Sequence, residues 1–152
     1  MRGSEFHRLA ALQAQALWID EVPPECAGFF RSFSDWLKAF VSEVVVVEQQ
    51  FVDKTLGFTG TPDAILRIKG DTGLTLVDWK SGQTASRGWR LQISAYRHLA
   101  EVNDYPISRV AILQPHPDGK KAKYSETTKS MTADWNVFKS MLTVFKFLEG
   151  GN

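Results

Sequence analysis

The stretch that decides the fold runs from Gly60 to Lys80 and reads GTPDAILRIKGDTGLTLVDWK. Two runs of alternating apolar residues flank a short polar break at residues 69–73, and this pattern predicts a β-hairpin. If Gly70 and Asp71 form a two-residue loop, Gly70 occupies the first central position that a type II′ turn requires. Residue i of one strand then faces residue 141 − i of the other.

This register places Asp63 directly opposite Asp78 on one face of the hairpin. Lys80 follows on the same face, because side chains alternate with period two, whereas Trp79 points to the other face, toward a core. Like charges directly opposite each other destabilise a strand pair, and one carboxyl resists ionisation unless a cation lies between them. The alternative is a solvated hairpin with ordinary surface acids, and a slip of one residue would move one acid to the opposite face.

A divalent metal would remove the repulsion between the two carboxylates. Hard oxygen ligands suit Mg²⁺ or Mn²⁺. Lys80, close to such a metal, could orient or deprotonate a water, or steady a phosphate oxygen. The hairpin alone therefore indicates metal-assisted hydrolysis of a phosphodiester.

The composition is that of one folded domain. The 152 residues are 43% apolar and 12% aromatic, which is enough for a core and excludes a disordered chain. A net charge of +1 neither requires nor excludes nucleic acid, because local clustering of charge matters more. The single cysteine, Cys26, excludes an internal disulfide and a Cys-rich zinc site, and fits a reducing cytosol. No signal peptide or apolar run of membrane-spanning length is visible, so no membrane association is expected.

Residues 1–6, MRGSEF, look like a vector-derived leader, and residues 7–152 are expected to form a single domain. Apolar residues at helical spacing predict a helix over His7–Asp20. Because this helix would begin directly after the leader, we expect a domain truncated at its N-terminus.

The remaining elements are predicted from apolar periodicity and from breaks at glycine and proline. They are a helix over 25–41, a strand over 44–52, hairpin strands over 58–68 and 74–80, a helix over 89–103, strands over 107–113 and 122–126, and a helix over 132–148. The run Val44–Val47 is expected to be buried on both faces, and the last helix to pack through Trp135, Phe138, Leu142 and Phe145. This order predicts an α/β fold in which helices flank a mixed sheet.

The motif GTPD, followed by a strand that ends in DWK, resembles the PD-(D/E)XK nuclease superfamily. Downstream, the run from Gln92 to Tyr96, QISAY, matches the QxxxY motif of its RecB-like branch. That branch includes lambda-exonuclease-like phage enzymes, CRISPR adaptation nucleases and mitochondrial genome-maintenance exonucleases. The resemblance extends from about His7 to Leu113. It implies an αβββαβ restriction-endonuclease-like core, which the order of predicted elements indicates independently.

The resemblance also implies a metal-dependent deoxyribonuclease. Asp63 and Asp78 would be the ligands of Mg²⁺ or Mn²⁺, and Lys80 would be the catalytic lysine. Gln92 and Tyr96 would orient the lysine, the metal or DNA, although two residues four apart also fit an ordinary helix-surface pair.

Other candidate residues lie near these motifs. Members of the RecB-like branch often carry a further metal ligand, a histidine on the first helix, and His7 has that place although the usual glycine-containing approach is missing. Glu48 is the alternative third ligand, but it equally fits a strand end that faces solvent. Arg87 and Arg90 could contact DNA phosphates or belong to a solvated charged face.

The implied partner is DNA, as a single strand or as a duplex end, in the cytoplasm of a bacterial or phage-infected cell. The resemblance favours an exonuclease over an endonuclease and leaves a homo-oligomer open. The alternative function is a catalytically silent nuclease-like module that binds nucleic acid or a protein partner. The intact set of Asp63, Asp78 and Lys80 argues against this alternative, because a silent module does not need all three.

Overall fold

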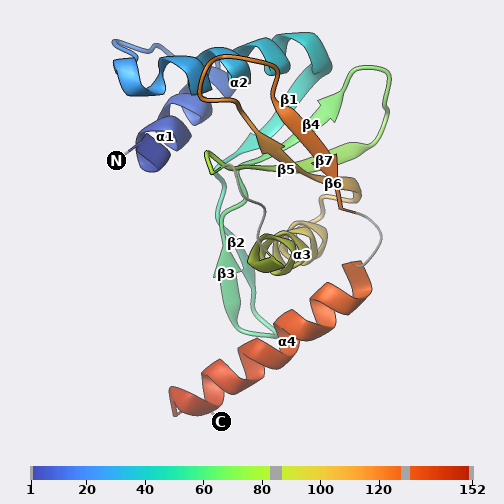
Figure 1. Ribbon diagram of the computed structural model, residues 1–152. Helices are drawn as coiled ribbons and strands as arrows, with labels where there is room; N and C mark the ends of the chain where they lie inside the picture. Colours follow the sequence, from blue (N-terminus) through green and yellow to red (C-terminus); the bar gives the residue numbers. More distant parts are fainter. Residues whose placement is uncertain (1, 83–86, 128–130, 151–152) are drawn as a thin grey trace.

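Figure 1 shows the computed structural model of the protein, which describes residues 2–82, 87–127 and 131–150. Its centre is a five-stranded mixed sheet, which confirms the predicted α/β class. The strands lie in the order β1 (Val41–Val47), β4 (Ala64–Ile68), β5 (Leu74–Trp79), β6 (Ile107–Gln114) and β7 (Lys123–Glu126). β5 and β6 are parallel and are connected through helix α3 (Arg87–Val102), while the other neighbours are antiparallel. With α2 (Ala27–Phe40) in front, the order α2, β1, β4, β5, α3, β6 gives the expected αβββαβ core.

Helices cover both faces of the sheet, and each face has its own apolar core. On one face, α1 (Arg2–Ala14) and α2 pack against β4, β5 and β6. Here the ring of Phe33 meets the fully buried indole of Trp79 edge-on, with 5.0 Å between centroids. On the other face, α3 packs Ile93 and Leu99 against the sheet. The prediction that Trp79 points into a core is therefore confirmed.

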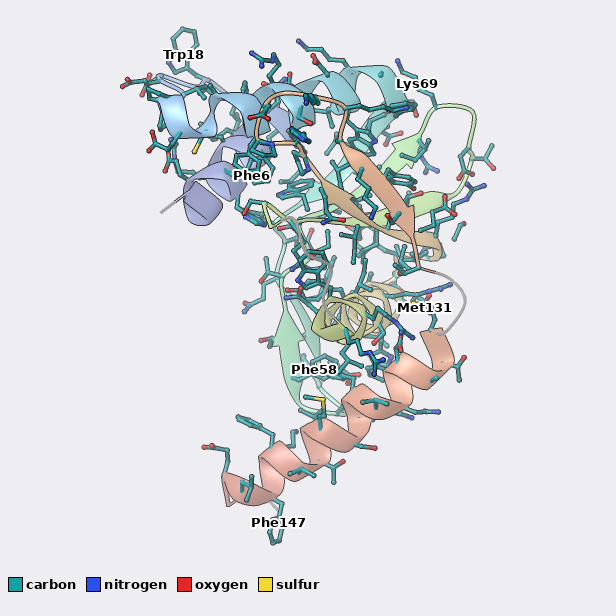
Figure 2. All side chains as sticks on the ribbon, viewed as in Figure 1. Phe6, Trp18, Phe58, Lys69, Met131 and Phe147 are labelled. Carbon is teal, nitrogen blue, oxygen red and sulfur yellow. The ribbon has the colours of Figure 1, made fainter. Side chains whose placement is uncertain are left out.

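The first helix differs from its prediction at both ends. α1 covers Arg2–Ala14, whereas the sequence predicted a helix over His7–Asp20. The helix stops because Ala16 adopts a left-handed backbone with φ 55°, a common helix ending. Residues 2–6, set aside as a leader, form the start of the helix, and Phe6, labelled in Figure 2, is fully buried in the core. Whether residues 1–6 derive from a vector stays a prediction.

Two of the predicted strands are each split into two. β2 (Phe51–Asp53) is separate from β1 because Glu48 has a φ of 49°, which interrupts the extended backbone. β3 (Phe58–Gly60) is separate from β4, and Pro62, which has no N–H for the ladder, lies between them. β2 and β3 pair with each other as a two-stranded sheet. β1 is an edge strand of the larger sheet, so Val44–Val47 is mostly half-buried, and the predicted burial on both faces is wrong.

Helix α4 (Met131–Leu148) docks through its first half. Its Trp135 and Phe138 contact Phe58 of β3, with ring centroids 6.2 and 5.1 Å apart. Figure 1 shows α4 crossing below α3 and the β2–β3 hairpin, with its C-terminal end projecting away from the domain. Phe145 is 60% exposed, so the prediction that it packs against the domain is wrong. No helix within the described ranges, α4 included, is both long enough and apolar enough to cross a membrane.

Truncation of Phe6 tests whether the first turns of α1 belong to the folded core. Phe6→Ala should lower the free energy of unfolding by about 3–5 kcal/mol, because loss of a fully buried ring leaves a cavity. Phe147→Ala is the control, since this ring is 78% exposed and its removal should change stability by less than about 0.5 kcal/mol. Urea denaturation followed by circular dichroism measures both values. Small and equal effects would contradict the burial of Phe6.

Candidate active site

The hairpin register predicted from the sequence is confirmed. β4 and β5 pair as residue i with residue 141 − i, through Ala64–Val77, Ile65–Leu76 and Leu66–Thr75. One residue before this ladder, the same register brings Asp63 opposite Asp78. Both aspartates therefore lie on the face of the sheet that α3 covers, because they share the alternation of Ile65 and Leu76.

The turn that closes the hairpin differs from the prediction. The N–H of Asp71 donates to the carbonyl oxygen of Ile68 at 3.0 Å, and Gly70 has a φ of 82°. Gly70 is thus the third residue of the turn rather than the second, and the predicted type II′ loop is wrong. The Asp71 carboxylate accepts the N–H of Gly73 at 3.0 Å, so the loop is wider than two residues while the register of the strands is unchanged.

The carboxyls of Asp63 and Asp78 are buried and in contact. The two residues are 8% and 4% exposed. Burial raises the pKa of Asp63 well above its usual range, and the charge of Asp78 and a hydrogen bond between the two carboxyls raise it further. The N–H of Trp79, which donates to Asp63 Oδ2 at 2.8 Å, acts in the opposite direction. Burial beside a second carboxyl therefore favours the protonated form of Asp63.

Lys80 connects this pair to α3. Its Nζ lies 2.8 Å from Asp78 Oδ2 and donates to Gln92 Oε1 at 2.6 Å. An ammonium can only donate, so the side-chain oxygen of Gln92 must face Lys80. The side-chain nitrogen of Gln92 is therefore available to Tyr96, one turn further along the helix. That nitrogen donates to the hydroxyl of Tyr96 at 3.2 Å. The predicted residues of the hairpin and of α3 are thus joined in one polar chain.

Tyr96 is packed where β3 approaches α3. A Cβ added to Gly60 would lie 2.9 Å from Tyr96 Cε1 and 2.8 Å from Leu99 Cδ1, so glycine is what allows this close approach. Burial, followed by the charges of Asp78 and Asp63, raises the pKa of Tyr96 to about 12. Its phenol therefore keeps its proton at neutral pH and can donate a hydrogen bond.

His7 and Glu48, the two candidates for a third metal ligand, are placed differently. His7 Nε2 lies 2.8 Å from the carbonyl oxygen of Trp79 and 3.8 Å from Asp63 Oδ2. Glu48 is bonded to the site only through its backbone, whose N–H donates to the carbonyl oxygen of Asp63 at 3.0 Å. Its side chain is exposed. The structure therefore brings the side chain of His7, and not that of Glu48, to the aspartate pair.

A family model described as the PD-(D/E)XK nuclease superfamily matches residues 2–146 of the chain. The chain belongs to the PD-(D/E)XK nuclease superfamily. A search of curated proteins finds no match. The match supports a nuclease function in general and leaves membership of the RecB-like branch a prediction.

The two arginines expected at the DNA also differ in their surroundings. Arg87, at the start of α3, is exposed. The guanidinium of Arg90 instead donates to both carboxylate oxygens of Asp134 on α4, at 2.8 and 3.1 Å. Arg90 therefore holds two helices together, and its charge is already offset by a carboxylate.

Two groups that lie at the site were not predicted from the sequence. One is the backbone carbonyl of Trp79, for which a sequence gives no signal. The other is Trp89, whose ring centroid lies 5.7 Å from Lys80 Nζ. The signal for Trp89 was its spacing, since residues 89, 92 and 96 fall on one side of a helix.

Metal-ligating side chains at the site form a chain rather than a closed cluster. In the part of the protein that the structure describes, no three His, Cys, Asp or Glu side chains gather closely enough to hold a metal ion. Asp63 nevertheless bonds to Asp78, and His7 Nε2 is 3.8 Å from Asp63 Oδ2.

The raised pKa of Asp63 predicts how stability depends on pH. Between its pKa in the unfolded chain, near 3.8, and its higher pKa in the folded protein, the folded state binds more protons. The free energy of unfolding should therefore fall as pH rises through this window. In Asp63→Asn the fall should be smaller, so this variant should lose less stability than wild type as pH rises from 4 to 8.

Urea denaturation in EDTA at several pH values between 4 and 8 measures this difference. Asp35→Asn is the control, because Asp35 is exposed and should keep the wild-type slope. Parallel curves for wild type and Asp63→Asn would contradict the raised pKa.

Proposed function

We propose that the protein is a metal-dependent deoxyribonuclease that hydrolyses phosphodiester bonds. One observation carries the proposal: two buried carboxyls touch each other, and the ammonium of Lys80 lies 2.8 Å from Asp78 Oδ2. Burying like charges together costs free energy in a purely structural sheet, and a divalent cation removes that cost. Membership of the PD-(D/E)XK superfamily supports the same reaction.

The donor groups present fit a small hard cation. Asp78 Oδ2 is buried and, among the described residues, has no hydrogen bond of good geometry even though Lys80 Nζ is near. His7 Nε2 lies 2.8 Å from the Trp79 carbonyl oxygen. Because a carbonyl can only accept, this nitrogen donates there in the structure and would have to give up its hydrogen to bind an ion. Asp63, Asp78 and His7 would hold the ion, with the Trp79 carbonyl beside them.

The bound ion, Mg²⁺ or Mn²⁺, would activate a water and offset charge on the phosphate. Lys80 would stabilise the negative charge that builds up on the phosphate in the transition state, because its ammonium is held in place by Asp78 and Gln92. Tyr96, which keeps its proton, fixes the other end of Gln92. Gln92 and Tyr96 thus position Lys80 without acting on the substrate themselves.

The substrate that we propose is DNA, as a single strand or a duplex end, cleaved by a RecB-like exonuclease in the cytoplasm. The matching QxxxY spacing on α3 supports this branch. Arg87 is the better candidate for a phosphate contact, because Arg90 is bonded to Asp134. Size-exclusion chromatography with light scattering would test whether the enzyme forms a homo-oligomer.

A catalytically silent module is the second candidate. It is favoured by the lack, among the described residues, of a closed cluster of three metal-ligating side chains. Mg²⁺-dependent cleavage of end-labelled single-stranded and duplex DNA separates the two functions, because only a nuclease releases labelled products. Retention of DNA binding without any cleavage would support the silent module.

Substitution of Asp78 tests the mechanism directly. Asp78→Asn should reduce Mg²⁺-dependent cleavage to below about one-thousandth of wild type, because the ion loses a charged ligand. Folding should be retained, since asparagine has the same shape and relieves the like-charge contact. Single-turnover assays on end-labelled DNA measure the rate, and Asp35→Asn controls for the loss of a surface carboxylate. Wild-type turnover in Asp78→Asn would rule out this mechanism.

Substitution of Lys80 separates a catalytic role from a structural one. Lys80→Ala should slow cleavage at least about 100-fold at saturating Mg²⁺. Its affinity for Mn²⁺ should stay the same or rise, because an ammonium is not a ligand and repels a cation. Calorimetric titration of Mn²⁺ gives the affinity, and single-turnover cleavage gives the rate. A loss of affinity in proportion to the loss of rate would mean that Lys80 only holds the site together.

A further inference from the structure

The ammonium of Lys80 has three neighbouring groups. Asp78 Oδ2 lies at 2.8 Å and Gln92 Oε1 at 2.6 Å. Nζ also lies over the indole of Trp89, 5.7 Å from the ring centroid. An ammonium carries three N–H groups, and an indole face attracts a cation more strongly than any other aromatic side chain does. Trp89 therefore offers the ammonium a third attractive contact.

Trp89 is itself held in a fixed position. It lies in the first turn of α3, three residues before Gln92 and seven before Tyr96, so all three side chains fall on one side of the helix. Its half-buried ring packs against the apolar core between α3 and the sheet. The chain that follows Lys80 passes close by, since a Cβ on Gly82 would lie 3.9 Å from Trp89 Cζ2. The indole is thus a rigid surface against which a flexible lysine can rest.

We propose that Trp89 is a positioning residue for Lys80, holding its ammonium beside Asp78 through a cation–π contact. This inference rests on the proposed function, because Lys80 is the residue through which Trp89 would act. A lysine has four rotatable side-chain bonds, so two polar contacts alone leave conformations in which the ammonium turns to solvent. The contact with the indole makes those conformations less favourable.

Substitutions at Trp89 separate the electrostatic contact from simple packing. Trp89→Leu keeps an apolar side chain but removes the aromatic face, whereas Trp89→Phe keeps a weaker face. At saturating DNA and Mg²⁺, Trp89→Leu should slow single-turnover cleavage about threefold to tenfold. The slowing in Trp89→Phe, expressed as the logarithm of the rate ratio, should be less than half of the slowing in Trp89→Leu. Trp18→Leu is the matched control, because Trp18 is 82% exposed and projects from the loop after α1 (Figure 2).

A double mutant tests whether Trp89 acts through Lys80. If it does, Trp89→Leu should cause no further loss in a Lys80→Ala background, because the group that it positions is already absent. An additive loss would overturn the inference and would assign Trp89 to another role. Thermal unfolding of each variant identifies a loss that comes from unfolding, and Trp89→Met, which also lacks an aromatic face, replaces Trp89→Leu if the leucine variant does not fold.

A spectroscopic measurement tests the contact without any nuclease assay. In protein labelled with ¹³C-lysine, the εCH₂ signal of Lys80 should be shifted upfield by the ring current of the indole, and Lys80→Ala identifies that signal. The shift should disappear in Trp89→Leu, persist in part in Trp89→Phe and stay unchanged in Trp18→Leu. An unshifted Lys80 signal in the wild type would overturn the inference. Absence of cleavage by the wild type would instead contradict the proposed function, while this measurement would still decide the contact.

Discussion

The contact between the carboxyls of Asp63 and Asp78 is the constraint on which the site depends. Both lie at the same end of β4 and β5, and apolar pairs farther along the strands fix them opposite each other. The contact costs free energy locally, because two acids are buried side by side. Two interactions offset part of this free energy: the N–H of Trp79 donates to Asp63, and the ammonium of Lys80 lies beside Asp78. Such a local violation of a folding rule is expected where function requires it.

The second half of the site comes from α3, and its position depends on elements outside the αβββαβ core. Gly60 lets β3 lie against Tyr96. On the opposite side of α3, Arg90 bonds to Asp134 of α4, and His98 stacks on Trp135 with 4.1 Å between ring centroids. The β2–β3 hairpin and α4 therefore pack against α3 and hold it in place. This matters for the site because α3 carries Gln92 and Tyr96, which connect to Lys80.

The sequence was sufficient for the parts of the fold that follow from local periodicity. The alternation around Gly70 gave the correct register even though the turn type was wrong, because buried apolar pairs and not the turn fix the strands. Composition could not show that Glu48 adopts a left-handed backbone, nor that Phe6 extends the first helix into the core. His98 carried no sequence signal, because its contacts with Asp53 and Trp135 join residues far apart in the chain.

The charges of the site balance only when a proton or a cation is included. Ionised Asp63 and Asp78 contribute two negative charges, and Lys80 offsets one of them. The raised pKa of Asp63 favours a proton as the group that offsets the other charge. An ion held as in the proposed function would replace that proton, so binding of the ion and release of the proton would be linked. Protons and divalent cations would then compete for the Asp63–Asp78 pair, while the register of β4 and β5 would stay the same.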